Sequence, residues 1–560
     1  MSRSSITTCV AALAGFAAIA AYPGGAPAAA PLPAHRPPHP APASTLPATA
    51  LLPRAAAGLA RVYGGTPIDV TTYHYDNYRT GWNQSETDLT PASVASSDFG
   101  LLTTLKVDGN VFAQPLMVSN FTMSDGNPHN VLIVATGHDS VYAFDAQTYT
   151  VLWQVSLGKS QSTSDVGCGD VKPEYGISST PIIVRNGSTA TIYVVAATEP
   201  SKGQFVSELH ALNLVTGADV TPPVVIAPSA TLSNGSTVNF DPQNQWNRTS
   251  LAYNKGSLYI GIGSHCDNNS GSISGWLLRY NTSLALQTAF HTIETPGGTE
   301  LASIWMTGFA PAIAPNGDVF VVTGNGDYQG KKAKDWGESV LSLPPTLAKV
   351  KSQFTPADYQ DLNNGDVDFG SGGVMLLPPV TGQTAPPLAV AMGKNPVLFL
   401  LDQTKLGGEK KNNSGVLQAL SLGGGAGVWG GPAYYAGPGG PTVFYQIDSD
   451  VLRAFAVTTG TAPSLTQYAQ GTSTAGYGGS LPIVSSNGTT AATGVVWLVR
   501  RSLPIVLEAY DASALGAPIF SANAGTWSNP GQGNAFMTPM EANGRVYVPA
   551  YKTVTVFGLQ

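Results

Sequence analysis

The sequence has few charged residues, few cysteines and, beyond its N-terminus, no long hydrophobic run. Charged residues make up 11% of the 560 residues, against about 25% in an average soluble domain. The formal net charge is −7 and there is no basic run, which argues against nucleic acid as a partner. No later apolar stretch approaches the ~20 residues of a membrane span, so we expect no transmembrane span in the mature chain.

The N-terminus predicts export. Residues 1–30 have the pattern of a signal peptide, with an apolar run over residues 10–22 and small residues over 26–30. Residues 31–68 are rich in Pro and Ala and predict a disordered linker. We therefore expect a periplasmic or secreted protein with a single folded domain over residues 69–560.

The scarcity of cysteine becomes informative once export is assumed. Only Cys168 and Cys266 remain in the mature chain. An oxidising compartment permits a disulfide between them. Two free thiols are the alternative.

What the sequence has in abundance is glycine, at 63 residues, and a repeated β pattern. The segment "NVLIVATGHDSVYAFDAQTYTVLWQV" (130–155) has the pattern strand, turn, strand, turn, strand. It recurs in degraded form, which gives eight copies over about 490 residues. Periodic units of this kind predict an all-β fold, a β-propeller. The later copies begin at Thr191, Ser257, Asp318, Pro387, Thr442, Gly494 and Gly544.

Two features of the copies predict how the ring is built. Trp153 ends the third strand-like segment of the first copy, and we expect it to fill the gap to the next blade. The last copy lacks a strand, which "FGLLTTLKVDG" (99–109) would supply, so that no sheet edge stays free. The residues equivalent to Trp153 in other copies are Phe290, Phe354, Tyr468 and Phe520.

The segment "SVYAFDAQTYTVLW" resembles the tryptophan-docking repeat of the quinoprotein alcohol dehydrogenases. These are eight-bladed β-propeller enzymes that use pyrroloquinoline quinone and calcium. The chain is also similar to a set of exported bacterial propellers related to them, through "YHYDNYRTGWNQSETDLTP", "CGDVKPEYGISSTP" and "GSGGVMLLP". The resemblance covers nearly the whole mature chain at the level of the repeat.

The resemblance implies a set of site residues. "IWMTGFAPAIAPNGDVFVVTGNGDY" implies Trp305 beneath the quinone and Asn325 as a calcium ligand. "DVDFGSGGVMLL" implies Asp368 as the catalytic carboxylate and a further calcium ligand, and "GKNPVLFLLD" implies Lys394 beside the quinone oxygens. "AATEPSKGQF" is a looser match that implies Glu199 as a calcium ligand. Carboxylate and amide oxygens are the ligands that calcium prefers.

The chain also departs from the family pattern. The enzymes have two adjacent cysteines, and Cys168 is followed here by Gly169. An arginine of the enzymes falls near Glu174 and Tyr175, and a glutamate falls on Phe112. There is no heme-attachment C-x-x-C-H motif.

Two functions therefore stay open. One is a quinone-dependent oxidoreductase acting on a small alcohol, aldehyde or sugar. The other is a noncatalytic propeller scaffold that binds a protein or glycan in the cell envelope.

Overall fold

The computed structural model describes residues 63–267, 273–297, 301–423, 425–527 and 537–560. The chain divides into two units, Met1–Arg54 and Ala55–Gln560. The predicted signal peptide and most of the predicted linker lie outside the described residues. The described strands and helices all belong to the second unit.

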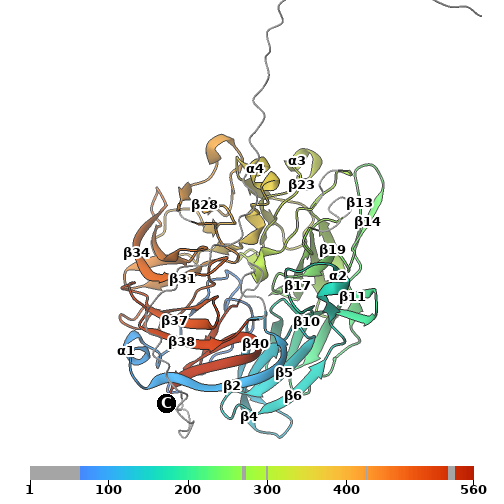
Figure 1. Cartoon of the computed structure of the whole chain (residues 1–560). Coiled ribbons are helices and arrows are strands. Elements are labelled where there is room, and N and C mark those ends of the chain that lie inside the picture. The colour runs from blue at the N-terminus through green and yellow to red at the C-terminus, as the bar shows by residue number, and fades with distance from the viewer. Residues whose placement is uncertain (1–62, 268–272, 298–300, 424, 528–536) are drawn as a thin grey trace, which may run out of the picture. The chain divides into compact units, whose positions relative to one another are not determined.

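Within the described residues, eight antiparallel sheets follow one another along the chain as the blades of a β-propeller (Figure 1). The prediction of an eight-bladed, all-β fold is confirmed. The first blade comprises β3 (Leu116–Thr122), β4 (Pro128–Ala135), β5 (Ser140–Asp145) and β6 (Val151–Ser156), and the second comprises β9 (Ile182–Asn186), β10 (Thr189–Ser201), β11 (Gln204–Asn213) and β12 (Val224–Val225). The third blade comprises β15 (Gln245–Asn247), β16 (Ala252–Asn254), β17 (Ser257–Ser264), β18 (Trp276–Asn281) and β19 (Leu286–His291). The fourth blade comprises β20 (Ala312–Ile313), β21 (Val319–Val322), β24 (Val340–Leu343) and β25 (Ser352–Thr355), with β29 (Gly408–Glu409) added in parallel.

The remaining four blades continue this pattern up to the C-terminus. The fifth blade comprises β26 (Val374–Leu376), β27 (Leu388–Ala391), β28 (Val397–Asp402) and β30 (Gln418–Ser421), and the sixth comprises β31 (Ala433–Gly437), β32 (Gly440–Tyr445), β33 (Val451–Thr458) and β34 (Ser464–Thr474). The seventh blade comprises β35 (Ile483–Ser485), β36 (Val495–Arg500), β37 (Ile505–Asp511) and β38 (Phe520–Gly525), with β1 (Trp82–Asn83) added in parallel. The eighth blade comprises β39 (Met540–Ala542), β40 (Arg545–Leu559) and β2 (Phe99–Asn110).

Further short elements lie in the connections between strands, some between blades and some within a blade. They are the hairpins β7 (Gln161–Ser162) with β8 (Glu174–Tyr175), β13 (Ser229–Thr231) with β14 (Thr237–Asn239) and β22 (Tyr328–Gln329) with β23 (Asp335–Trp336); the helices α1 (Pro91–Val94), α2 (Thr163–Val166), α3 (Gly330–Ala333) and α4 (Tyr359–Asn364); and the 3-10 turns η1 (Met306–Gly308), η2 (Phe369–Ser371) and η3 (Lys411–Asn413). No helix among the described residues is long and apolar enough to cross a membrane.

The last blade is closed by the N-terminal strand, as the sequence predicts. β40 is a long strand whose first part pairs with β39 and whose second part pairs with β2, from Phe99 opposite Leu559 to Lys106 opposite Thr553. β2 and β40 come from opposite ends of the domain and lie side by side in Figure 1. Through this pairing, backbone N–H and C=O groups of β40 gain hydrogen-bond partners that the C-terminal copy alone could not provide.

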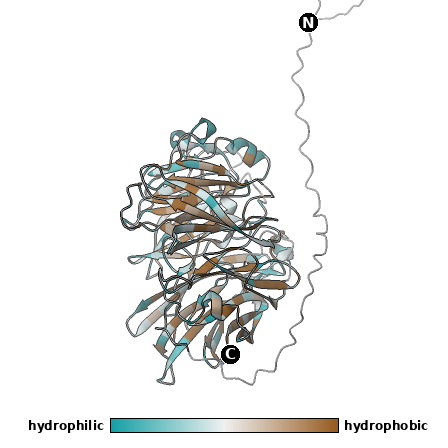
Figure 2. Ribbon diagram, turned by 90° about the vertical axis from the view of Figure 1, so that its left-hand side faces the viewer, coloured by the Kyte–Doolittle hydropathy of each residue, from teal (hydrophilic) through white to brown (hydrophobic). Residues whose placement is uncertain are grey.

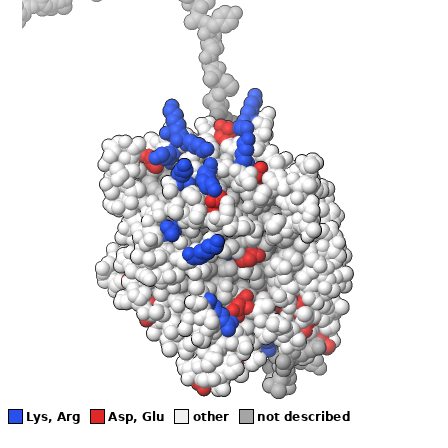
Figure 3. Space-filling model, turned by 180° about the vertical axis from the view of Figure 1, so that it is seen from behind, with Lys and Arg blue, Asp and Glu red and all other residues white. Residues whose placement is uncertain are grey.

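Much of the strand ribbon has the colour of hydrophobic residues (Figure 2), and the side chains of these strands form buried clusters. All six residues of β5 are buried, whereas the edge strand β6 alternates between more and less exposed positions. Most of the face in Figure 3 carries neither sign, and Lys and Arg side chains gather in its upper and middle part.

Aromatic side chains join neighbouring blades, but not at every predicted position. The Trp153 Nε1 donates a hydrogen bond to the Leu214 carbonyl in the next blade, 2.9 Å away. Phe520 packs edge-on against Phe99 of β2, with 4.7 Å between ring centroids. Tyr468 was expected in an equivalent gap, but its side chain is 50% exposed and its hydroxyl contacts Thr442.

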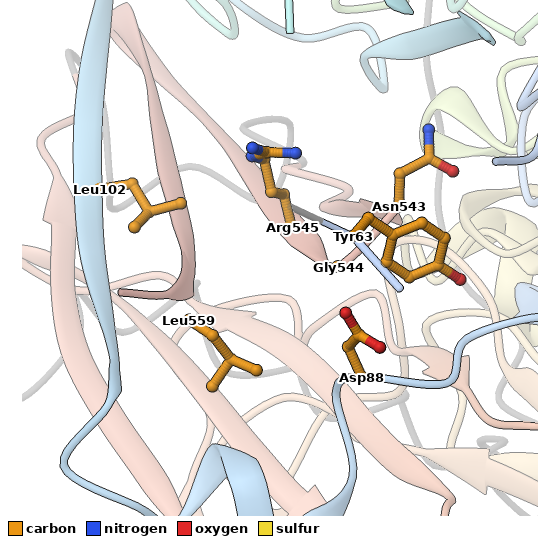
Figure 4. Close-up of a pocket in the computed structure, with 7 residues that line it drawn as sticks. All are labelled: Tyr63, Asp88, Leu102, Asn543, Gly544, Arg545 and Leu559. Atoms are coloured by element: carbon orange, nitrogen blue, oxygen red, sulfur yellow. The ribbon is translucent and has the colours of Figure 1, made fainter. Parts of the chain in front are cut away.

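Residues 63–68, assigned to the linker by composition, already contact the propeller. The Ile68 N–H donates to Asn543 Oδ1, 2.8 Å away, and the Tyr63 hydroxyl donates to the Ser85 carbonyl. Side chains of this segment and of the last blade surround a pocket of about 10 Å³ (Figure 4), which has room for one water molecule at most. The pocket therefore lies where the segment 63–68 packs against the last blade and is not a ligand site. Its lining residues are Tyr63, Asp88, Leu102, Asn543, Gly544, Arg545 and Leu559.

Candidate functional site

Four of the predicted site residues lie at matching ends of strands in neighbouring blades. Trp305 and Asp368 come before the first strands of the fourth and fifth blades, β20 and β26. Asn325 and Lys394 come after the second strands, β21 and β27. In an antiparallel pair, the start of one strand and the end of the next lie at the same edge. The repeat therefore carries all four side chains to one edge of two adjacent blades.

Asp368 is the centre of this group. Its Oδ1 accepts hydrogen bonds from the Asn325 N–H at 2.9 Å and from Trp305 Nε1 at 3.3 Å. Its Oδ2 forms an ion pair with Lys394 Nζ at 2.6 Å. We call Trp305, Asn325, Asp368 and Lys394 the central cluster. Residues up to 89 positions apart are thus joined through one carboxylate.

Asp366 adds a second carboxylate to the central cluster. Its Oδ1 lies 3.0 Å from Lys394 Nζ and accepts a hydrogen bond from Asn325 Nδ2 at 2.8 Å. The Asn325 side-chain oxygen is left buried without a hydrogen-bond partner. A buried amide oxygen next to two carboxylates is an arrangement that a cation would complete.

Charge within the cluster keeps Asp368 ionised. Burial raises the pKa of Asp368, but the Lys394 ammonium and the hydrogen bonds from Lys394 and Asn325 outweigh burial and leave this pKa below its ordinary value. Burial lowers the pKa of Lys394, but the two carboxylates outweigh it and raise that pKa. Burial and the negative charge of Asp368 raise the pKa of Asp366.

Asp267 is a further acidic group that the sequence did not suggest. It follows β17, the second strand of the third blade, so it holds the position that Asn325 and Lys394 hold in their own blades. Burial and the charge of Asp368 raise the pKa of Asp267 to about 6. A usable signal was the spacing, because Asp267, Asn325 and Lys394 each lie three residues after the end of the second strand of their blade.

Two further residues, Glu338 and Gly324, lie against the cluster and constrain its geometry. The Glu338 carboxylate is fully buried, and its Oε2 accepts the N–H of Phe369 at 2.6 Å, which holds the backbone beside Asp368. Gly324 faces Asp368 and Trp305 so closely that a Cβ there would lie 2.3 Å from Asp368 Oδ1. The contact between Trp305 and Asp368 therefore requires a residue without a side chain at position 324.

Three solved structures share the arrangement of the blades. A quinohemoprotein alcohol dehydrogenase from Comamonas testosteroni superposes with a TM-score of 0.58 at 16% identity, over 88% of this chain and 80% of its own. A second one, from Pseudomonas putida HK5, gives 0.55 at 12% identity over the same shares of the two chains. A europium-containing methanol dehydrogenase gives 0.56 at 11% identity, over 88% of this chain and 91% of its own. No protein-family model and no curated protein sequence matches the chain.

The chain has the fold of the quinoprotein alcohol dehydrogenases. At 11 to 16% identity this likeness concerns the arrangement of the blades. The shared fold does not assign a role to any single residue, whereas the geometry of the cluster shows which side chains interact.

Glu199, the least well matched of the expected ligands, does not contact the central cluster in this quinoprotein fold. It lies near the end of β10, the second strand of the second blade. Its carboxylate accepts the Gly203 N–H at 2.8 Å and lies 3.5 Å from Lys159 Nζ. Asp267, one blade closer to Trp305, does interact electrostatically with Asp368.

The departures from the family pattern have structural replacements. Cys168 forms a disulfide with Cys266, the residue before Asp267, with a Cα–Cα distance of 5.6 Å. Tyr175, near the position of the missing arginine, is buried and packs edge-on against Trp246. Phe112 is buried against Trp527.

Arg248 is a further residue near the cluster that sequence reasoning missed. Its guanidinium carbon lies 4.7 Å from the centre of the Trp305 ring and 5.6 Å from that of Trp246. Lys394 Nζ lies 5.7 Å from the same Trp305 ring. Trp305 therefore interacts with two cations that come from different blades.

Proposed function

We propose that this protein is an exported quinoprotein-like propeller that binds pyrroloquinoline quinone and calcium at the central cluster. It would oxidise a small alcohol, aldehyde or sugar. The observation that carries the proposal is the contact among Trp305, Asn325, Asp368 and Lys394. These are the residues that the family motifs single out, and each occupies an equivalent position in its own repeat.

The donor groups fit a hard cation. Calcium takes six to eight oxygen ligands from carboxylates, carbonyl groups and water. Asn325 offers a buried amide oxygen without a partner, and Asp368 and Asp267 offer carboxylates. Asp366 and Asp368 both pair with the Lys394 ammonium, and Asp267 interacts electrostatically with Asp368 and Lys394. Carboxylate and amide oxygens gathered in this way suit a divalent ion.

The other residues fit a flat anionic cofactor and a proton acceptor. The Trp305 indole would support the ring, and Lys394 would donate to its oxygens. Asp368 is ionised beside Lys394, so it can accept the hydroxyl proton of a substrate. When bound, the quinone supplies the acceptor for the two electrons, and the protein orients it and the substrate.

One group of observations favours the alternative, a noncatalytic scaffold for an envelope protein or glycan. The adjacent cysteine pair is replaced by a bond from Cys168 to Cys266. The positions of the family arginine and glutamate carry Tyr175 and Phe112, both buried in aromatic contacts. If the protein is such a scaffold, the cluster keeps the arrangement of an enzyme site but binds no cofactor.

Quinone titration with calcium, followed by dye reduction with a panel of alcohols, aldehydes and sugars, separates the two functions. Asp368→Asn should keep quinone binding within a few-fold and lower dye reduction at least a hundredfold, because the amide cannot accept the substrate proton. Asp361→Asn, on the exposed side of α4, is the matched control and should leave both unchanged. Absence of quinone binding at micromolar concentration would leave the scaffold function.

A further inference from the structure

Arg248 is a buried cation held between two indole rings. Its side chain is 4% exposed and lies between Trp246, two residues earlier, and Trp305 of the next blade. Burial lowers the pKa of Arg248 to about 10, while the charges of Asp170, Tyr175 and Asp368 oppose this effect. The guanidinium is therefore still charged at neutral pH, close to the carboxylates of the central cluster.

A second arginine reinforces the positive charge here. Arg501, from the seventh blade, is buried, and the charge of Arg248 contributes to lowering its pKa to about 10. Lys394 stands over the Trp305 ring as well, 5.7 Å from its centre. Arg248 and Lys394, from the third and fifth blades, thus lie over the Trp305 ring, and Arg501 of the seventh blade adds positive charge that acts on Arg248. Positive groups around a flat indole suit a planar ligand with several negative groups.

Arg248 lies close to the segment in which the arginine of the family pattern is missing. The family pattern has an arginine near Glu174 and Tyr175, and neither residue can carry a positive charge. Tyr175 packs edge-on against Trp246, with 4.8 Å between ring centroids, and interacts electrostatically with Arg248. Arg248 therefore reaches, from the next blade, the neighbourhood in which the arginine is missing.

We propose that Arg248 binds a carboxylate of the planar quinone that lies on Trp305, and so replaces the arginine that this chain lacks. The inference rests on the proposed function and extends it: the quinone pocket is rebuilt from the third blade. A guanidinium binds a carboxylate through two parallel hydrogen bonds and stacks on aromatic rings, two properties that an ammonium group does not share.

Equilibrium binding tests the inference without any measurement of catalysis. Pyrroloquinoline quinone and its trimethyl ester are each titrated, with calcium, into the wild-type protein, Arg248→Gln and Arg248→Lys. Quenching of tryptophan fluorescence and equilibrium dialysis report the dissociation constants. We expect Arg248→Gln to weaken binding of the free acid at least tenfold and to leave binding of the ester within twofold. Arg248→Lys should fall between the wild-type protein and Arg248→Gln, because it keeps the charge but not the paired hydrogen bonds.

The controls separate a binding role from a structural one. Arg185→Gln removes a cation that pairs with Asp69 outside the cluster and should leave both dissociation constants unchanged. Melting curves show whether each variant is folded, and the ester provides an internal standard for an intact pocket. If Arg248→Gln binds acid and ester with the same ratio as wild type, the inference is wrong and the proposed function stands. If the wild-type protein binds neither compound, the proposed function itself fails.

Discussion

Gly324 sets the distance between the two central side chains of the cluster. A Cβ at this position would lie 2.3 Å from Asp368 Oδ1 and 2.8 Å from Trp305 Nε1, closer than a Cβ atom approaches other heavy atoms in folded proteins. Gly324→Ala should therefore push Asp368 away from Trp305 and destabilise the protein by about 1–3 kcal/mol, the usual effect of overpacking a close contact. Melting curves and calcium titration should both register the change.

The matched control for this substitution is Gly516→Ala. A Cβ at position 516 would meet nothing within 4 Å, so we expect the melting temperature and calcium affinity to stay at their wild-type values. Equal behaviour of the two variants would mean that the loop around Asp368 adapts freely, and the close packing of the cluster would then have no functional consequence.

Single residues also show where sequence reasoning reached its limit. The motifs around Trp305, Asn325, Asp368 and Lys394 named four side chains that do meet. Glu199 was drawn from a weaker match, and its carboxylate contacts Gly203 and Lys159. Second strands of different blades can end in similar polar runs, as in "GIGSHCD" and "VVTGNGD", so a degraded repeat can be assigned to the wrong blade. Contacts such as that of Arg248 with Trp305 depend on rotamers that no spacing in the sequence specifies.

At the scale of elements, the disulfide joins the segment after α2 to the end of β17. It links Cys168 and Cys266, 98 residues apart in the chain, and Cys266 directly precedes Asp267. A cross-link over a loop of this length stabilises a protein by up to about 4–5 kcal/mol in the chain-entropy model. Reduction should therefore lower the melting temperature by several degrees and weaken calcium binding, because the backbone that positions Asp267 loses its anchor.

Thiol labelling in denaturant shows whether the bond is present. We expect no labelled cysteine in the mature protein before reduction and two after it. The variant with both Cys168→Ser and Cys266→Ser should be insensitive to reductant, in melting temperature and in calcium affinity. Two labelled thiols without reductant would contradict the bond.

The order of the strands was the easiest feature to predict from the sequence. Alternating apolar residues and turns gave the copies, and the missing strand of the last copy led to β2, which pairs with β40 as expected. The edge additions β1 and β29 were not predicted, because each contributes only two residues and pairs in parallel with a strand far away in the chain. Such short pairs depend on where loops pass, which tertiary packing decides.

At the scale of the whole molecule, ring closure brings together two buried carboxyl groups from opposite ends of the domain. Glu86 follows β1, and Glu541 lies on β39; both are fully buried. Asn83 Nδ2 donates to Glu541 Oε2 at 2.6 Å, and the Gly544 N–H donates to Glu86 Oε2 at 3.0 Å. Burial, and then the charge of Glu86, raise the pKa of Glu541 well above its ordinary value of 4.5. Glu541 is therefore protonated in the folded protein at pH values at which an unfolded chain would release the proton.

This difference predicts how stability depends on pH. Below about pH 4.5 both states hold the proton, so Glu541 makes no pH-dependent contribution. As the pH rises above that value, the unfolded state loses its proton first, and the free energy of unfolding falls until the pH passes the raised pKa of the folded state. Glu541→Gln cannot ionise and keeps an acceptor for Asn83, so its melting temperature should exceed that of wild type increasingly from pH 5 to pH 8, and the two should converge near pH 4. Glu409→Gln, at an exposed position, is the control and should follow the wild-type curve. Parallel curves for wild type and Glu541→Gln would show that the seam between the N-terminal segment and the last blade does not hold a proton.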